Sequence, residues 1–423
     1  MSVRPIIEEL KTLWPRKDYS RVPFRFYHDP DLYREELERI FRGPTWSYLC
    51  LEAEIPNPGD FRTTLVGETP VVVNRKGDGE VAAFVNRCAH RGAIVRREAY
   101  GNAKEHICVY HRWCYAQDGS LTGVPFRRGV GGKGGMPDDF DPKSNGLQKL
   151  VIRSLNGVVF GTFAAECESL EDYLGPVMVA HIERLMHKPI RILGYQRQTV
   201  FGNWKLYMEN VRDSYHGGLL HEFQNTFGIS RVTQVGGARM DTRHRHHITY
   251  SSASEATDGS QLHKEAGVVN DRLQLADASL LEYIPEFADG QQLTISSVFP
   301  NAVFQQIRNC LATRQLRPRG VDEFDLVFTL YGYVDDSPRM LDLRLVQANM
   351  IGPAGYISME DGEAIEIVHR ATRGEREKSG LLEMGGLGPI PDEIKFRTSE
   401  VSIRGFWSYY AALMNMEPDE ACR

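Results

Sequence analysis

Two short pairs of metal-binding residues constrain the fold of this chain more than any other feature. Cys88-Ala-His90 and Cys108-Val-Tyr-His111 are separated by 17 residues. Each pair offers one thiolate and one imidazole, and both groups bind transition metals. These four side chains can converge only if two loops are held side by side. The surrounding chain must therefore form a rigid scaffold for the loops.

This ligand set is that of a Rieske [2Fe–2S] cluster, in which two Cys bind one iron and two His bind the other. Imidazole is neutral where thiolate is anionic, so the cluster accepts an electron more readily than an all-Cys cluster does. Structural zinc is the alternative, because two Cys and two His also form a tetrahedral site. A zinc finger usually groups its two Cys in one arm and its two His in the other. Each arm here carries one of each, which favours the iron cluster and single-electron transfer.

Size, charge and cysteine usage narrow the class of protein. The 423 residues allow two or three domains with a large core. A net charge of −6 argues against a nucleic-acid partner. No apolar run reaches the length of a membrane span, and the N-terminus has no signal-peptide core. The seven cysteines are an odd number without a disulfide-framework spacing, which predicts a cytoplasmic location.

The pattern of apolar residues predicts an α+β protein with three segments. Residues 1–42 form a helical segment, with a helix over 31–42. Residues 43–165 form a small all-β domain that holds both Cys/His pairs in loops. Residues 166–423 form a larger domain in which helices alternate with longer strands. The expected strands are 71–73, 81–85, 107–110, 158–163, 293–299, 325–334 and 343–350, and the last helix is 398–414.

A second candidate metal site lies in the segment 203–221. His216 and His221 are five residues apart, which is about 140° on an ideal helix. The two imidazoles can share one ion only if the helix opens, and Gly217-Gly218 between them makes that easy. Two His and one carboxylate with open positions form the facial triad of mononuclear iron(II) oxygenases. The carboxylate is expected to be Asp361, with Glu360 as the alternative, at the start of a helical pattern over 364–373.

These elements together resemble the α (large) subunit of a Rieske non-haem iron ring-hydroxylating oxygenase. The resemblance spans nearly the whole chain. It is carried by the Cys-x-His and Cys-x-x-His pairs, by Asn203-Trp-Lys with Glu209-Asn-x-x-Asp-x-Tyr-His-x4-His221, and by Glu360-Asp-Gly. Within the family the chain is most similar to salicylate hydroxylases, anthranilate dioxygenases and terephthalate dioxygenase. One departure is that Cys108-Val-Tyr-His111-Arg112 lacks the Pro and Gly often found in this loop.

The resemblance implies a set of cofactors, partners and roles. Residues 166–423 are implied to be a larger catalytic domain with a central antiparallel sheet flanked by helices, and the segment 1–42 to pack on it. The implied cofactors are a Rieske cluster and mononuclear Fe(II). Family members place the cluster of one subunit near the iron of its neighbour in a ring of three, with an acidic residue bridging the His ligands. Asp213 matches that residue, and Asn210 matches a position close to the iron. A small β subunit in an α3β3 assembly is implied, with a ferredoxin or reductase as electron donor, because the sequence shows no convincing nicotinamide or flavin site of its own.

The sequence gives little information about the substrate. The resemblance implies an aromatic carboxylate and dioxygen, and a buried carboxylate needs a cation because an unpaired one is costly. Arg suits this role through its planar fork of donors. Arg314 in a strand-like stretch and Arg404 in the last helix are the candidates, with Thr249 as a hydroxyl donor.

Several functions remain open at this stage. The expected activity is hydroxylation of salicylate or a related ortho-substituted benzoate such as anthranilate. The first alternative is a terephthalate 1,2-dioxygenase large subunit. A less favoured alternative is a Rieske protein that only transfers electrons. A zinc-stabilised binding module is a further alternative.

Overall fold

The computed structural model describes residues 6–255 and 260–418. The first five residues of the expected N-terminal segment lie outside this description. Clustering of contacts divides the described chain into two compact units. One unit consists of residues 41–170. The other combines the residues up to 40 with the residues from 171 onward.

The unit of residues 41–170 is built almost entirely of short antiparallel strands. A three-stranded sheet has the order β10-β11-β2, a four-stranded sheet the order β5-β4-β3-β6, and a smaller sheet the order β7-β8-β9. The strands are β2 (Ser47–Leu51), β3 (Asp60–Val66), β4 (Thr69–Arg75), β5 (Val81–Val85), β6 (Tyr100–Asn102), β7 (His106–Ile107), β8 (Cys114–Tyr115), β9 (Leu121–Gly123), β10 (Val151–Leu155) and β11 (Val158–Thr162). Central strands such as β4 are rich in Val, which favours the pleated conformation.

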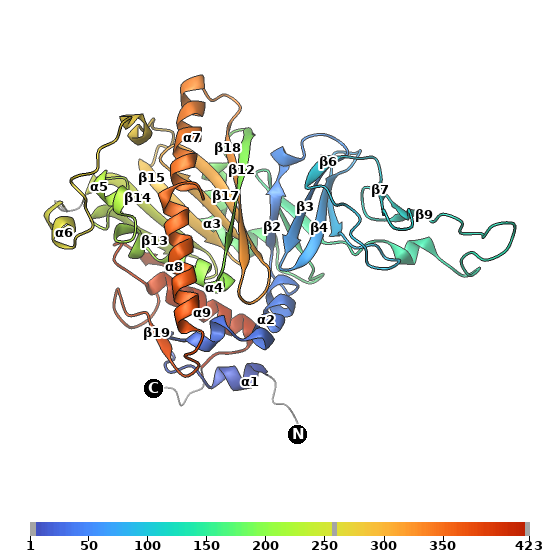
Figure 1. Cartoon of the computed structure of the whole chain (residues 1–423), viewed down its shortest axis with the longest axis horizontal. Helices are drawn as coiled ribbons and strands as arrows, with labels where there is room; N and C mark the ends of the chain where they lie inside the picture. The colour runs from blue at the N-terminus through green and yellow to red at the C-terminus, as the bar shows by residue number, and fades with distance from the viewer. Residues whose placement is uncertain (1–5, 256–259, 419–423) are drawn as a thin grey trace. The chain divides into compact units, whose positions relative to one another are not determined.

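The other unit is organised by one antiparallel sheet of eight strands, in the order β12-β18-β17-β16-β15-β14-β13-β20 (Figure 1). The strands are β12 (Ile190–Val200), β13 (Gln234–Met240), β14 (His247–Glu255), β15 (Gln291–Val298), β16 (Ala302–Ile307), β17 (Cys310–Pro318), β18 (Phe324–Tyr333) and β20 (Glu393–Ile394). A small separate pair joins β1 (Arg21–Pro23) to β19 (Ser379–Leu381). The predicted central antiparallel sheet is confirmed.

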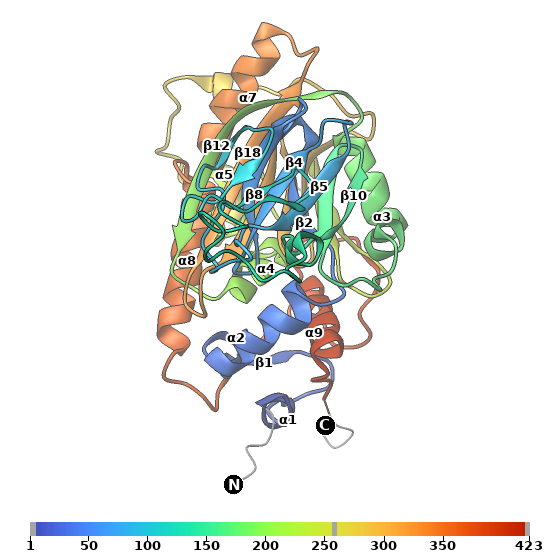
Figure 2. The ribbon, with the colours of Figure 1, turned by 90° about the vertical axis from the view of Figure 1, so that its right-hand side faces the viewer.

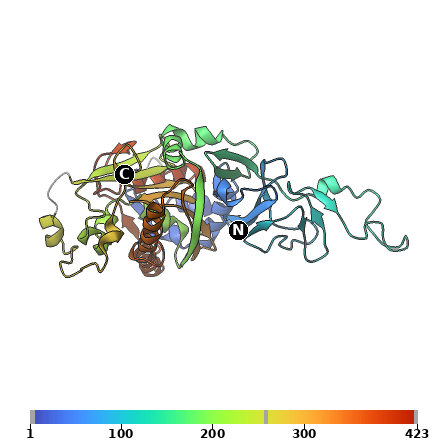
Figure 3. The ribbon, with the colours of Figure 1, turned by 90° about the horizontal axis from the view of Figure 1, so that it is seen from above.

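Helices cover both sides of this sheet. Figures 2 and 3 show α7 and α8 on one side and α3 on the other. The helices are α1 (Ile6–Lys11), α2 (Pro30–Glu36), α3 (Leu170–Leu185), α4 (Trp204–Arg212), α5 (Glu222–Thr226), α6 (Ser260–Glu265), α7 (Pro338–Ile351), α8 (Tyr356–Thr372) and α9 (Val401–Met414). The N-terminal helices lie beside α9 in Figure 1, where Trp14 packs edge-on against Trp407 at a ring distance of 5.8 Å.

A buried polar cluster fixes the N-terminal segment to α4 and α9. The carboxylate of Glu36 accepts hydrogen bonds from Trp204 Nε1 at 2.7 Å and from Tyr410 Oη at 2.5 Å, and it pairs with Lys205 Nζ at 2.6 Å. All four side chains are buried. Removing one partner of a buried ion pair leaves an uncompensated charge and costs about 3–5 kcal/mol. The start of α4, which leads into the second candidate metal site, is therefore firmly anchored.

Two local predictions are corrected by the structure. The segment 343–350, predicted as a strand, lies inside helix α7. A short apolar run has no period of its own that separates strand from helix, and here the helix is capped by Ser337, whose hydroxyl accepts from Met340 N. The strand predicted over 107–110 ends at Ile107, because Cys108 already begins a tight loop.

No helix in the described residues is long and apolar enough to cross a lipid bilayer.

Candidate active site and metal centres

The two Cys/His loops share one backbone arrangement. In each loop the Cys N–H donates to the carbonyl five residues on, at 2.8 Å from Cys88 to Ala93 and 2.9 Å from Cys108 to Trp113. In each loop the N–H four residues after the Cys donates back to the Cys carbonyl at 2.9 Å. That fourth residue is Gly92 with φ +75° in the first loop and Arg112 with φ +56° in the second. Arg112 thus adopts a left-handed conformation that glycine adopts at lower cost.

The loops bring the four predicted ligands into two layers. Cys88 and Cys108 are buried in the core of the small unit, whereas His90 and His111 are exposed. The two imidazole rings lie 4.6 Å apart between centroids, and His90 stacks on Trp113 at 4.8 Å. Two sulfurs inside and two imidazoles outside fit a cluster whose Cys-bound iron is buried and whose His-bound iron faces the surface.

Tyr115 adds a contact that the sequence did not reveal. Its hydroxyl lies 3.1 Å from Cys88 Sγ and 3.1 Å from the N–H of Ala89. The Ala89 N–H donates to the hydroxyl oxygen. When Cys88 is a thiolate, as a metal ligand is, the sulfur carries no proton and the Tyr115 hydroxyl is the donor to it. Hydrogen bonds to cluster sulfurs are one way in which proteins raise the reduction potential.

The second site begins where α4 ends. Asp213 caps the helix, and its Oδ1 accepts from the N–H groups of Tyr215 at 2.8 Å and His216 at 3.1 Å. This side-chain turn redirects the chain into a single turn of 3₁₀ helix at His216–Gly218, and α5 starts only after His221. No α-helix therefore joins the two histidines, but α4 ends at Arg212, before both of them, and not at Gly217-Gly218 as expected.

His216, His221 and Asp361 converge on one point. Asp361 Oδ1 lies 3.3 Å from His216 Nε2 and 3.4 Å from His221 Nε2, and one donor atom from each residue falls within a group no wider than 4.8 Å. Asp361 comes from α8, which packs closely on β12 because Gly362 has no side chain to collide with the Gln198 amide. This donor set matches the two-His, one-carboxylate triad of mononuclear iron(II) sites.

The electrostatics of this group favour a bound cation. Although burial opposes a charged imidazole, hydrogen bonds to Asp213 and Asp361 raise the pKa of His216 to about 10. Burial likewise opposes a charged carboxyl, yet His221 and His216 hold the pKa of Asp361 far below its usual range. Two acids therefore act on two imidazoles inside a buried site, and a metal ion can supply the positive charge that they demand.

Three neighbours orient these side chains. Glu360 Oε2 lies 2.7 Å from His221 Nδ1, which leaves Nε2 directed at Asp361. Asp213 Oδ2 lies 3.4 Å from His216 Nδ1 on the far side of that ring. Asn210 Nδ2 donates to Asp361 Oδ1 at 3.1 Å and lies 3.4 Å from His216 Nε2. Outer contacts of this kind set the tautomer and direction of metal-binding imidazoles. Glu360, the alternative carboxylate, thus holds a ligand from behind.

A cavity opens directly beside this group. Its walls come from the segment 210–230, from α8, and from the face of the sheet formed by β14 to β17. The lining residues are Asn210, Val211, Asp213, Ser214, His216, Gly217, His221, Gln224, Ser230, Thr249, Leu293, Ile295, Ile307, Arg314, Ile357, Asp361 and Arg397. Five aliphatic side chains and a few polar ones make a surface suited to one aromatic ring.

Arg314 is placed in this cavity, as the sequence analysis expected of a substrate contact. It lies on β17 and is buried. Its guanidinium donates to Gln305 Oε1, at 2.7 Å from Nε, and to Tyr207 Oη at 3.1 Å. These partners are neutral, so the charge of Arg314 is not balanced by an acid within the described chain.

Arg397 also lines the cavity and was missed from the sequence. It lies in the connection between β20 and α9, and it is buried. Its Nη2 donates to Ser230 Oγ at 2.8 Å and its Nη1 to the Arg231 carbonyl at 2.6 Å, whereas Nε has no acceptor. Burial lowers the pKa of Arg397 to about 10, so the side chain is a cation at neutral pH. No regular pattern surrounds residue 397, so the sequence offered no signal.

Arg404 lies elsewhere. It is buried on α9, and its Nη2 donates to the Gly386 carbonyl at 2.6 Å. It does not line the cavity, and its contacts hold a loop in place. Thr249 does line the cavity, with its hydroxyl 3.0 Å from His247 Nε2.

Family models match both parts of the chain. Residues 45–132 match the Rieske [2Fe-2S] domain, and residues 186–416 match the catalytic domain of the ring-hydroxylating alpha subunit. The chain therefore belongs to the family of Rieske ring-hydroxylating oxygenases, as a large (alpha) subunit. This membership rules out the zinc-stabilised module and the protein that only transfers electrons.

Three similar proteins align with almost the full length of this chain. The chain is 47% identical to the anthranilate 1,2-dioxygenase large subunit of Burkholderia cepacia, over 95% of each chain. It is 47% identical to the terephthalate 1,2-dioxygenase terminal oxygenase component subunit alpha 2 of Comamonas sp, over 96% of this chain and 98% of the relative. It is 40% identical to the salicylate 5-hydroxylase large oxygenase component of Ralstonia sp, over 95% and 96%. The predicted resemblance to this subgroup is confirmed.

The fold agrees with that of a solved structure. Naphthalene 1,2-dioxygenase from Rhodococcus sp. bound to indole superposes with a TM-score of 0.80 at 23% identity, over 96% of this chain and 98% of that chain. The protein is thus an oxidoreductase that incorporates molecular oxygen, and its cofactors are a [2Fe–2S] Rieske cluster and mononuclear iron.

Proposed function

We propose that this chain hydroxylates an aromatic carboxylate, in first place salicylate or a related ortho-substituted benzoate such as anthranilate. The observation that carries the proposal is Arg397, a buried cation that lines the cavity without an acidic partner in the described chain. A buried charge is costly unless it is both hydrogen-bonded and paired with an opposite charge, and Arg397 has the hydrogen bonds but not the opposite charge. A substrate carboxylate provides the missing negative charge, and the aliphatic wall accommodates the ring.

The cluster ligands in this proposal are Cys88, His90, Cys108 and His111, and the unit of residues 41–170 works as the Rieske domain. The support is the shared backbone arrangement of the two loops and the 4.6 Å separation of the imidazole rings. The cluster supplies electrons one at a time. Tyr115 directs its hydroxyl proton at Cys88 Sγ and so helps to set the potential.

The iron ligands in this proposal are His216, His221 and Asp361, in the catalytic domain formed by the rest of the chain. The iron supplies dioxygen activation in the positions that three protein ligands leave open. Asn210 holds Asp361 through its amide, Glu360 holds His221, and the cavity beside the ligands positions the substrate ring. Excluding water and fixing the ring are the tasks of the chain's own residues.

Asp213 is proposed to connect the two metal sites across neighbouring subunits. Its Oδ1 is used by the backbone of the turn, and its Oδ2 faces His216. Asp213→Asn keeps the cap of α4 but removes the charge. We expect iron and sulfide contents to stay at the wild-type level while product formation falls by about 10–100-fold, the effect typical of outer contacts to metal ligands. Metal analysis and product analysis on one preparation test this, and near-normal hydroxylation in the metal-replete variant would refute the role.

The proposed partners follow from the names of the similar proteins, which are large or alpha subunits and oxygenase components. We propose a small β subunit in an α3β3 assembly and a ferredoxin or reductase as electron donor, in the cytoplasm. Sedimentation of the purified oxygenase gives the stoichiometry.

The substrate proposal is tested by oxygen uptake and product analysis with the purified oxygenase and a surrogate reductase. The panel contains salicylate, anthranilate and terephthalate, with benzamide as the uncharged control. Hydroxylated product from the acids and not from benzamide supports the proposal. Equal turnover of benzamide would show that the enzyme does not require a carboxylate on its substrate.

A dicarboxylate such as terephthalate is the second candidate, because Arg314 and Arg397 both line the cavity and both have neutral partners. Two unbalanced cations suit a substrate with two negative charges. A higher kcat/KM for terephthalate than for salicylate and anthranilate would favour this candidate.

A further inference from the structure

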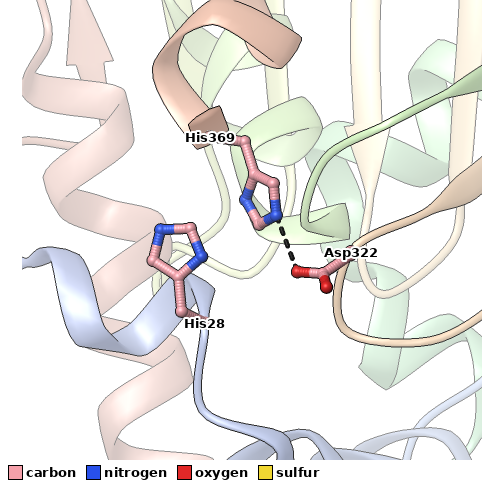
Figure 4. Close-up of side chains that lie close together, drawn as sticks. All are labelled: His28, Asp322 and His369. Carbon is pink, nitrogen blue, oxygen red and sulfur yellow. Dashed lines mark hydrogen bonds and ion pairs between the residues drawn. The ribbon is translucent and has the colours of Figure 1, made fainter. Parts of the chain in front are cut away.

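A second group of two histidines and one carboxylate lies outside the cavity. One donor atom each from His28, Asp322 and His369 falls within a group no wider than 4.8 Å. His28 follows the 3₁₀ turn Phe24–Tyr27, Asp322 lies in the turn between β17 and β18, and His369 lies near the end of α8 (Figure 4). None of the three lines the cavity beside Asp361.

One ring nitrogen of His28, Nδ1, has neither a proton nor a hydrogen-bond partner. Its Nε2 lies 2.9 Å from Thr372 Oγ1, and the Thr372 hydroxyl donates its own proton to the Val368 carbonyl at 2.9 Å. Thr372 must therefore accept from His28, which places the proton on Nε2. His28 Nδ1 is then a lone pair that is buried and has no hydrogen-bond partner.

The Nδ1 of His369 is a second ring nitrogen without a proton or a hydrogen-bond partner. His369 Nε2 lies 2.8 Å from Asp322 Oδ1 and 3.4 Å from Arg373 Nη2. The shorter contact, to the carboxylate, places the proton on Nε2 as the donor to Asp322. Its Nδ1 is buried and has no hydrogen-bond partner. The rings lie 4.4 Å apart between centroids, and Figure 4 shows one ring nitrogen of each directed toward the other histidine. Two lone pairs that face each other without a donor repel unless a positive group lies between them.

The charges around this group allow a cation. Arg25 is paired with Asp29 at 3.0 Å and with Glu9 at 2.5 Å. Arg373 is the cation that competes directly, because its Nη2 lies 2.8 Å from Asp322 Oδ1. The Arg373 side chain is 58% exposed, so it can move into solvent at small cost.

We propose that His28 and His369 bind a divalent cation of the zinc class through their Nδ1 atoms, with Asp322 supplying negative charge. Asp322 accepts from His369 Nε2, and this carboxylate–imidazole–metal arrangement fixes the ring and makes it a better ligand. The ion must also compete with the positive charge of the arginines in the wall of an adjoining cavity, which is lined by Arg25, His28, Asp29, Pro30, Thr372, Arg373 and Arg376. This cavity admits water to the remaining positions of the ion. Zinc accepts nitrogen and oxygen donors in this way. The ion ties the N-terminal segment to α8, the helix that carries Asp361.

The test is a zinc count on the iron-loaded oxygenase. The holoenzyme is dialysed against micromolar zinc sulfate, and zinc and iron per chain are measured by elemental analysis. We expect one zinc per chain with the iron count unchanged. The zinc is lost in His28→Asn and in His369→Asn but kept in His187→Asn, a matched change at an exposed histidine outside the group. Arg373→Ala binds zinc severalfold more tightly, because the competing cation is gone.

Other outcomes overturn the site. They are the absence of zinc from the wild type, zinc that enters only as iron leaves, and equal zinc binding by His28→Asn and the wild type. A zinc-dependent rise in Tm gives an independent readout, because it must appear in His187→Asn and disappear in His28→Asn. Neither readout depends on hydroxylation, so failure here is distinguishable from failure of the proposed function.

Discussion

Asp361→Ala is expected to abolish hydroxylation while the Rieske cluster remains. Asp361 is the carboxylate that lies within 3.4 Å of both His216 Nε2 and His221 Nε2, and it balances the charge of both imidazoles. Its loss leaves two neutral nitrogens, which hold iron(II) poorly. Product formation falls to background, the mononuclear iron is lost, and the visible absorption of the cluster is unchanged. Iron and sulfide analysis with single-turnover product measurement checks each part.

Glu363→Ala is the matched control for this change. Glu363 is an exposed acid on the same helix, α8, and lies outside the group formed by Asp361 and the two histidines. The control must keep the full iron content and normal turnover. A wild-type level of iron and product in Asp361→Ala would show that the ion is held by other residues.

Arg397→Gln is expected to lower kcat/KM for aromatic acids by about 30-fold or more. Truncating one partner of a buried, hydrogen-bonded charge pair costs about 2–5 kcal/mol, and each 1.36 kcal/mol is about tenfold in rate. Glutamine retains a donor for Ser230 but carries no charge. Turnover of any uncharged substrate analogue should be affected far less, because its binding does not use the cation. Steady-state kinetics over the panel of acids measure the effect.

Arg404→Gln is the matched control for Arg397→Gln. It removes an equally buried guanidinium that contacts loop carbonyls and does not line the cavity. It should change stability more than kcat/KM.

The pKa of Arg397, about 10, adds a pH test. The side chain is charged below that value, so KM for the acid should stay flat through neutral pH and rise above pH 10. An unchanged KM in Arg397→Gln would exclude the carboxylate contact.

The convergence of His216, His221 and Asp361, which we propose as iron ligands, could be predicted from the sequence because their spacing has few other uses. The 140° mismatch between His216 and His221 required that no continuous helix join them. The α-helix ends at Arg212, and a short 3₁₀ turn at His216–Gly218 separates the two histidines from each other. Choosing Asp361 over Glu360 was harder, because consecutive helical residues differ by 100° and can both face one site. The structure gives each a contact with His221, Asp361 at Nε2 and Glu360 at Nδ1.

The substrate side of the site was less predictable. Arg314 lies in a stretch with strand-like composition, so it could be proposed, and the strand β17 is buried along almost its whole length. Arg397 lies in an irregular connection, and only tertiary packing brings it to the cavity. Arg404 was chosen because it lies in a clear helix, but its side of that helix faces loop carbonyls. The strand predicted over 343–350 failed for a related reason, since a short apolar run fits either a strand or a buried helix.

The central claim is that this chain uses a Cys/His-bound cluster and a lone iron to place oxygen from O2 on an aromatic acid. The most direct measurement is a single turnover of the chemically reduced oxygenase with salicylate, anthranilate or terephthalate under ¹⁸O₂, followed by mass spectrometry of the product and EPR of the cluster. The account predicts ¹⁸O in the hydroxylated product of at least one acid, together with loss of the reduced-cluster signal. Product without the label, or a fully iron-loaded protein that forms no product from any of the acids, would contradict it.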